Sequence, residues 1–235
     1  MSGVLIFEGM KVGFLPGDLK IDMSGTGSSS AILSTAYNVV PIWLKIGHDS
    51  LKLAKSASSQ IADQWAADPE NQKKMLIAEL APSMQVFVSC GIALDALYDT
   101  LRQHANISRE DIEQWKANKT SREKQISEVI RRTHNVKAKD LTEFKKCIKW
   151  IIKFRDLAVH PSSELKNSCG RPDISVGVDW KFATYRFENA KACLNNVIGI
   201  LGYLWDNPSK NETTNEEISN IIKALNELGV IKSNK

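Results

Sequence analysis

The chain has 235 residues, which is enough for one large domain or for one domain with short appendages. With 43% hydrophobic and 25% charged residues, it has the composition of an ordinary soluble globular protein with a sizeable core. The net charge of +4 permits an acidic partner such as nucleic acid but is too small to establish one. No window approaches the roughly 18 apolar residues of a membrane span, and the first residues lack the basic start of a signal peptide. We therefore expect a cytoplasmic protein with no membrane partner.

The residues that most often bind metals or form disulfides are scattered. No C-x-x-C pair occurs among the four cysteines, and three of them fall between apolar residues in helical patterns, so we interpret them as reduced thiols: Cys90, Cys147, Cys169 and Cys193. Three histidines have no metal-pair spacing: His48, His104 and His134. The carboxylates form no D-x-D or E-x-x-H pattern. The sequence predicts neither a metal site nor a cofactor.

The first part of the chain, residues 1–30, differs from the rest. Two short strand-like runs, 4–7 and 19–23, lie around the glycine- and proline-containing segment 13–17 and predict a small β-hairpin. Residues 24–30, with the sequence SGTGSSS, have the composition of a flexible linker. A phosphate-binding loop would need a G-K-[ST] ending, which this segment lacks.

From residue 31 onward the apolar residues follow a helical period. Residues 31–65 predict one or two helices, interrupted or kinked at Pro41 and Gly47. Asp68 before a proline is a typical helix start, and the helix that follows is expected to kink or break near Pro82. Further helices are expected at about 112–116, 121–132, 139–160 and 181–205, and after a capping box at 214–217. Without βαβ alternation, the predicted fold class is all-α: a bundle of long antiparallel helices with a small N-terminal hairpin-like appendage.

The helix expected at 139–160 carries one charge in the wrong place. Its apolar residues fill one wide arc, and Arg155 projects from the middle of that arc. A guanidinium is costly to bury without a partner, so Arg155 either meets a carboxylate inside the bundle or faces a groove or subunit interface. Asp95, which interrupts the apolar pattern at 92–98, is the candidate for a structural ion pair.

The opposite face of this helix is polar and basic. Asp156 and His160 stand one turn apart, so the carboxylate can reach the imidazole, and Lys149 and Lys153 lie on the same face. A histidine so placed suits proton transfer near neutral pH. The alternative is a histidine that only caps the end of a solvated helix.

The run Arg155-Asp-Leu-Ala-Val-His160 resembles the R-x4-6-H motif of the HEPN superfamily (higher eukaryotes and prokaryotes nucleotide-binding domain). In that family the motif lies near the end of a long helix, an earlier helix resembles residues 92–101, and a further helix follows as 185–205 would. The resemblance covers roughly residues 70–206. It divides the chain into a strand-like segment with linker (1–30), a HEPN-like bundle (31–206), and a linker with a short C-terminal helix (207–235).

Many members of this superfamily are metal-independent endoribonucleases that act as dimers in toxin–antitoxin and anti-phage systems. The resemblance implies that RNA is the substrate, that His160 handles the proton in attack by a 2′-hydroxyl, and that Arg155 holds the phosphate. Asp156 would support His160, and Lys149 and Lys153 would bind the strand. The implied partners are a second copy of the chain and an antitoxin or other regulator. The alternative is a non-catalytic HEPN-like module that binds a partner or serves as a scaffold.

Overall fold

The structure is a computed structural model that describes residues 4–7, 9–21, 23, 29–65, 68–160 and 163–232. The chain forms two compact units, Met1–Val39 and Val40–Lys235. The described residues of the larger unit are mostly helical, and those of the smaller unit contain short antiparallel strands. This architecture confirms the prediction of a helical bundle with a small N-terminal hairpin.

The N-terminal unit is a ribbon whose strands pair across the glycine- and serine-rich segment. β1 (Met10–Gly13) pairs with β4 (Ser34–Tyr37), and β2 (Leu19–Lys20) pairs with β3 (Ser30–Ala31). The strands therefore pair differently from the hairpin expected around 13–17. Residues 4–7, expected to be a strand, form none. Asp18 links the two sides of the ribbon, because its carboxylate accepts hydrogen bonds from the Leu15 amide at 2.6 Å and the Ser34 hydroxyl at 3.0 Å. Most of the expected linker, 24–28, lies outside the described residues.

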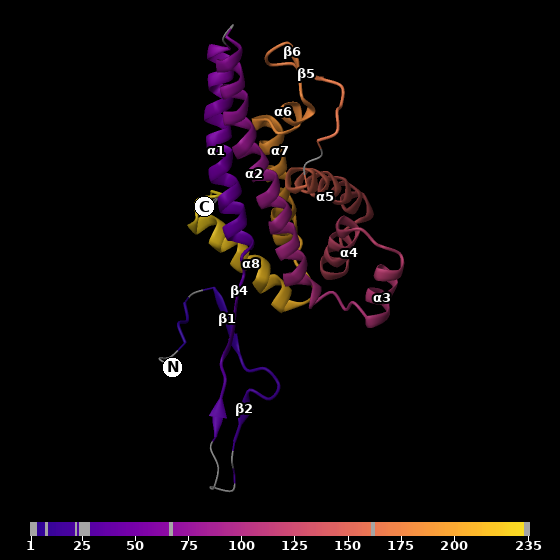
Figure 1. The fold of residues 1–235 in the computed structure, drawn as a ribbon. Helices are drawn as coiled ribbons and strands as arrows, with labels where there is room; N and C mark the ends of the chain where they lie inside the picture. Colours follow the sequence, from indigo (N-terminus) through magenta and orange to yellow (C-terminus); the bar gives the residue numbers. More distant parts are fainter. Residues whose placement is uncertain are drawn as a thin grey trace. The chain divides into compact units, whose positions relative to one another are not determined.

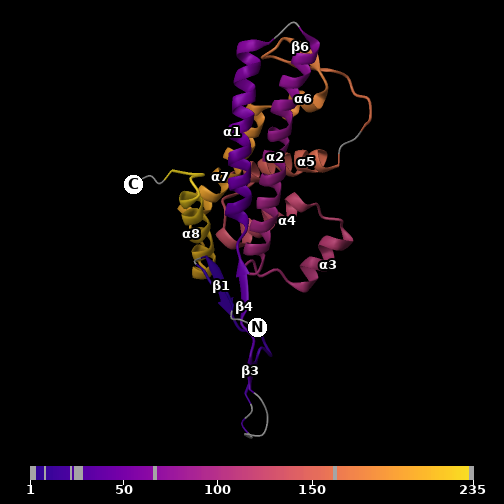
Figure 2. The same ribbon diagram turned by 60° about the vertical axis from the view of Figure 1, so that its left-hand side comes forward.

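The larger unit contains eight helices and one short hairpin in its described residues. The helices are α1 (Val40–Gln64), α2 (Pro69–Arg102), α3 (Arg109–Ala117), α4 (Arg122–His134), α5 (Ala138–Val159), α6 (Trp180–Thr184), α7 (Phe187–Asp206) and α8 (Glu212–Glu227). The hairpin is formed by β5 (Cys169–Arg171) and β6 (Val176–Val178). Helices α1 and α2 lie side by side along most of their length (Figures 1 and 2). Helix α2 also packs against α4, α5 and α7, and is therefore the central helix of this unit.

Both long N-terminal helices continue through residues expected to interrupt them. The expectation of a helix from residue 31 is wrong, because residues 34–37 form β4 and helix α1 begins only at Val40. Pro41 therefore lies in the first turn of α1, where a missing amide proton costs no hydrogen bond. The helix then runs through Gly47 without a break. Helix α2 has the predicted start, because Asp68 accepts hydrogen bonds from the Glu70 and Asn71 amides. It continues through Pro82, and packing against four other helices offsets the loss of one backbone bond there.

The C-terminal helices begin at places that the apolar pattern did not indicate. The helix expected at 181–205 is two helices, α6 and α7, separated at Tyr185 and Arg186. Helix α8 is capped by Asn211, whose side chain accepts from the Thr214 amide at 3.1 Å, and not by a box that starts at Thr214. The apolar pattern cannot show these starts, because the Phe187 amide at the start of α7 donates to the distant Glu79 of α2 and α8 is capped by a single polar side chain.

Helix α2 is the one described helix that is long and apolar enough to cross a membrane by length and composition. Of its most apolar window, 44% is buried inside the structure. The central helix of a helical bundle meets the same criterion, so this is weak evidence for a membrane span.

The histidine at the end of α4 gives a prediction for pH-dependent stability. The His134 side chain is only 6% exposed, and burial lowers its pKa from 6.5 to about 4. Its Nδ1 lies 2.9 Å from the Thr133 hydroxyl. Between pH 6.5 and 4 the unfolded chain binds a proton that the folded chain does not, so stability falls as the pH is lowered through this window, by about 3 kcal/mol in total.

Urea unfolding at several pH values between 7.5 and 4 measures this effect. Replacing His134→Gln should remove the part of the slope between pH 6.5 and 4. The carboxylates of Asp111 and Glu128, whose pKa values are lowered to about 2 by ion pairs, add a slope of their own below about pH 5, because their unfolded forms already bind protons there. The difference between the two proteins, and not the slope of the wild type alone, therefore isolates His134. Equal slopes for the two proteins would contradict the prediction.

Candidate functional site

Arg155 and Asp95, the two charged residues that interrupt apolar patterns in the sequence, lie in one ion-pair network between α2, α4 and α5. The Arg155 guanidinium donates from Nη1 to Oδ2 of Asp95 at 2.7 Å and from Nε to Oδ1 of Asp156 at 2.7 Å. The Arg155 side chain is 17% exposed and that of Asp95 is 26% exposed. The network therefore lies at the edge of the core and remains open to solvent.

The other oxygen of Asp95 is occupied by a second arginine. Oδ1 of Asp95 accepts from Nε of Arg122 at 2.6 Å, and the Arg122 guanidinium also lies 3.7 Å above the Tyr98 ring. One carboxylate on α2 thus binds the first turn of α4 and the C-terminal part of α5. Burial lowers the pKa of Arg155, but the Asp95 carboxylate outweighs this effect, so the pKa lies above its usual value and Arg155 stays charged.

Close contact between α2 and α5 depends on Gly91. A Cβ atom at this position would lie 2.5 Å from Cγ and 2.9 Å from Cβ of Arg155. Distances under 3.0 Å are not tolerated, and these atoms lie too near the α5 backbone to move freely. Gly91 therefore makes room for the stem of Arg155 on its way to Asp95. The sequence pattern gave no sign of this role, because it depends on the distance between two helices.

The other predicted site residues lie on the exposed face of α5 or at its end. His160 is the C-cap of α5 and is exposed, and its backbone amide donates to the Asp156 carbonyl at 2.8 Å. Its imidazole has no hydrogen-bond partner among the described residues. The Asp156 carboxylate binds Arg155, and no bond to His160 is formed. Lys149 and Lys153 are exposed on the same helix.

The structure therefore brings together Arg155, Asp95 and Asp156, and it leaves His160 as a free imidazole one turn beyond them. An ideal helix separates residues 155 and 160 by about 140° around its axis. The hydrogen bonds of the Arg155 side chain in the described residues go to Asp95 and Asp156, and none goes to His160. The ion pair between Arg155 and Asp95, one of the two possibilities for Arg155, is present. The sequence did not indicate that Arg122 and Gly91 also belong to this site.

No group of three or more histidine, cysteine, aspartate or glutamate side chains in the described residues could hold a metal ion. The four cysteines are free thiols. Cys90 and Cys193 are buried, and Cys147 and Cys169 are partly exposed. The groups capable of chemistry that the structure describes at the end of α5 are the arginine, the histidine and their carboxylates.

Comparison with known proteins finds no matching family model, no matching curated protein and no matching solved structure. The arrangement of side chains around Arg155 is therefore the basis for the functional conclusion.

Proposed function

We propose that this protein is a metal-independent endoribonuclease of HEPN type, with an active site formed at the α5 ends of two copies of the chain. One observation carries the proposal. Asp95 and Asp156 hold Arg155 through Nη1 and Nε, whereas its Nη2 has no partner within the described part of the chain and the side chain reaches solvent. An arginine oriented in this way can offer its remaining donors to a phosphate.

The chemistry requires a proton acceptor beside the held cation, and the exposed His160 imidazole is that group. As a general base, His160 takes the proton of a ribose 2′-hydroxyl, and the 2′-oxygen attacks the adjacent phosphorus. The bond from phosphorus to the 5′-oxygen breaks, and the 5′-oxygen leaves with a proton from a protonated histidine. Arg155 stabilises the negative charge that builds up on the phosphate oxygens. The products are a 2′,3′-cyclic phosphate and a 5′-hydroxyl end.

A second copy of the chain completes the site in this proposal. Because Arg155 and His160 project about 140° apart from one helix, the histidine of one copy serves the arginine of the other. The exposed Lys149 and Lys153 then line the approach of the RNA strand. The free thiols fit a cytoplasmic effector of toxin or anti-phage type, which in this proposal is held in check by an antitoxin or other regulator.

A second candidate is a HEPN-like scaffold that cleaves nothing. The observation that favours it is the engagement of two Arg155 nitrogens by carboxylates, which is also what a purely structural ion pair between helices requires. The two candidates differ in one measurable property, namely strand cleavage.

Incubation of the purified protein with end-labelled single-stranded RNA in EDTA tests the proposal. We expect cleavage that EDTA does not reduce, with cyclic phosphate and 5′-hydroxyl ends detected by mass spectrometry. A DNA strand of the same sequence is the control and should stay intact, because it lacks the attacking 2′-hydroxyl. Products with 5′-phosphate ends, or activity lost in EDTA, would exclude this mechanism, and intact RNA under all conditions would favour the scaffold.

A further inference from the structure

A second feature with recognisable chemistry is a pocket enclosed by the C-terminal end of α2, helix α3 and the start of α4. Its volume is about 350 Å³, which falls in the range of roughly 300–1,000 Å³ typical of small-molecule sites. Nine residues line it: Tyr98, Arg102, Ile112, Trp115, Lys116, Lys119, Thr120, Arg122 and Gln125. None of them belongs to α5, so the pocket is separate from the residues of the proposed cleavage site.

The lining of this pocket is strongly basic. Four of the nine residues are lysine or arginine, and none is a carboxylate. Arg102, Lys116 and Lys119 are exposed and have no acidic partner among the described residues. Arg122 is paired with Asp95, so Arg102, Lys116 and Lys119 are the cations that give the pocket a positive potential and favour an anionic ligand.

Two flat groups lie next to these cations, namely the Trp115 ring and the plane of the Arg122 guanidinium, because the Tyr98 ring itself is buried. The Arg122 guanidinium covers the Tyr98 ring at 3.7 Å, and Trp115 forms part of another wall. Gln125 donates from Nε2 to the Thr120 carbonyl at 2.8 Å, while its Oε1 has no partner in the described part of the chain. Ring faces and guanidinium planes stack on nucleobases, and a free amide oxygen accepts from a base amino group.

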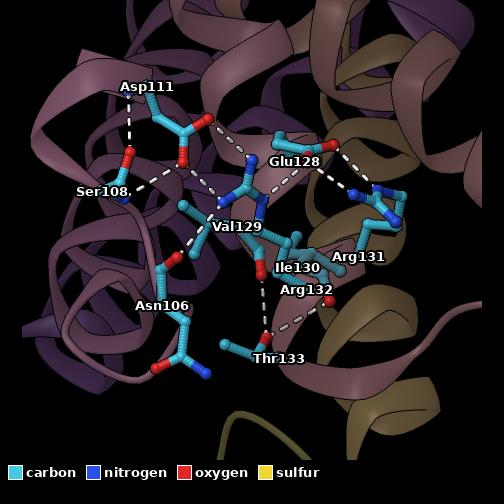
Figure 3. A network of polar contacts seen from close by, with 9 residues as sticks. All are labelled: Asn106, Ser108, Asp111, Glu128, Val129, Ile130, Arg131, Arg132 and Thr133. Atoms are coloured by element: carbon cyan, nitrogen blue, oxygen red, sulfur yellow. Dashed lines mark hydrogen bonds and ion pairs between the residues drawn. The ribbon is translucent and has the colours of Figure 1, made fainter.

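Ion pairs hold the two helices around the pocket in place. Arg132 of α4 donates to both oxygens of Asp111 of α3, at 2.7 and 3.0 Å, and to Glu128 at 2.8 Å. Figure 3 shows the Arg132 guanidinium between these two carboxylates. The pairing with Arg132 lowers the pKa of Asp111 to about 2, so the link persists at neutral pH. The pocket between α3 and α4 is thus preformed, which reduces the cost of binding.

We propose that this pocket binds a nucleoside phosphate, either as a free nucleotide or as one nucleotide of an RNA strand. The base stacks beside Trp115 and the Arg122–Tyr98 pair, and the phosphate lies against Lys116 and Lys119. This site goes beyond the proposed cleavage, because it requires neither Arg155 nor His160. It is nevertheless connected to them, since Arg122 and Arg155 share the carboxylate of Asp95.

Titration calorimetry with adenosine monophosphate, ribose 5-phosphate and inorganic phosphate tests this inference on the full chain. We expect adenosine monophosphate to bind at least tenfold more tightly than ribose 5-phosphate, because only the former has a base to stack. The Trp115→Leu variant should reduce this preference to less than threefold. Equal affinities of the wild type for all three compounds would overturn the inference.

Charge variants show whether binding takes place in the pocket. Lys116→Glu with Lys119→Glu should weaken nucleotide binding at least tenfold, whereas Lys124→Glu with Lys139→Glu, exposed positions outside the pocket, should change it less than twofold. Because α3 contains no fully buried residue, the first pair should leave the circular dichroism spectrum unchanged. An equal loss of nucleotide affinity in the two double variants would mean that surface charge in general attracts the ligand, and it would overturn the proposal that the pocket binds it.

Two further comparisons identify the source of the ligand and separate this inference from the proposed nuclease. A five-nucleotide RNA that binds more than tenfold better than the monophosphate indicates a strand, and equal affinity indicates a free nucleotide. His160→Ala should bind the monophosphate like the wild type, whether or not the protein cleaves RNA. Loss of nucleotide binding in His160→Ala would place the ligand at the α5 end instead and contradict the pocket.

Discussion

Replacing His160 with alanine is expected to slow RNA cleavage by about 10²–10⁴-fold, the usual contribution of a general acid or base. The folded state should be unaffected, because the imidazole is exposed and has no partner among the described residues. Arg155→Lys should slow cleavage by about 10²–10³-fold, since lysine keeps the charge beside Asp95 but loses the guanidinium fork that holds a phosphate. Lys145→Ala, an exposed position on the same helix, is the control and should cleave normally.

Mixing the two inactive variants tests whether the site is shared between subunits. If the arginine of one copy serves the histidine of the other, a mixed dimer of His160→Ala and Arg155→Lys contains one intact site. Co-refolding equal amounts should then restore about one quarter of the wild-type activity, since half the dimers are mixed and each has one working site out of two. Recovery near zero, with mixed dimers present by mass spectrometry, would contradict the shared site. Full activity of either single variant would exclude the proposed roles.

The part of this site that the sequence predicts correctly is the part that breaks a periodic pattern. Helix α5 was expected at 139–160 and spans Ala138–Val159. Arg155 and Asp95 each interrupt an apolar run, and since buried charges need partners, the sequence offers their pairing as one of two possibilities, which the structure shows. The resemblance to the HEPN motif rests on the run from Arg155 to His160 and stays a prediction.

The remaining features depend on distances that no local pattern contains. Arg122 lies in a polar helix start and is typical of an exposed residue until Asp95 is placed beside it. The basic pocket is built from three separate segments, and its aromatic residues follow the helical period like ordinary core residues. The β5–β6 hairpin has strands of three residues each, too short for a period of two to be recognised.

The most deeply buried charges in the described residues form a second network, away from α5. Nη2 of Arg171 donates to Oε2 of Glu79 at 2.5 Å, and both side chains are 1% exposed. Arg171 also binds Asp173, while Oε1 of Glu79 accepts the Phe187 amide at 2.8 Å. A single carboxylate of α2 therefore holds both the β5–β6 hairpin and the first turn of α7.

Glu79→Ala is expected to destabilise the helical unit by about 3–5 kcal/mol, because it leaves a buried guanidinium without its most buried partner. The lost cap at Phe187 adds to this cost. Urea unfolding followed by circular dichroism measures the change. Asp173→Ala is the matched control and should cost less, because the Asp173 side chain is 34% exposed and water can replace it. A change below 1 kcal/mol for Glu79→Ala would contradict this account of the pair.

A double variant separates the cost of an unpaired charge from the value of the pair. Glu79→Leu with Arg171→Met removes both charges at similar volume and should recover most of the stability that Glu79→Ala loses. Its effect on RNA cleavage is informative, because the Tyr185 hydroxyl, next to the start of α7, donates to the Phe154 carbonyl at 2.8 Å. The segment between α6 and α7, which Glu79 holds at the Phe187 amide, thus contacts α5 one residue before Arg155. A stable double variant with slow cleavage would mean that the buried pair fixes the position of Arg155, whereas normal cleavage would limit the pair to stability.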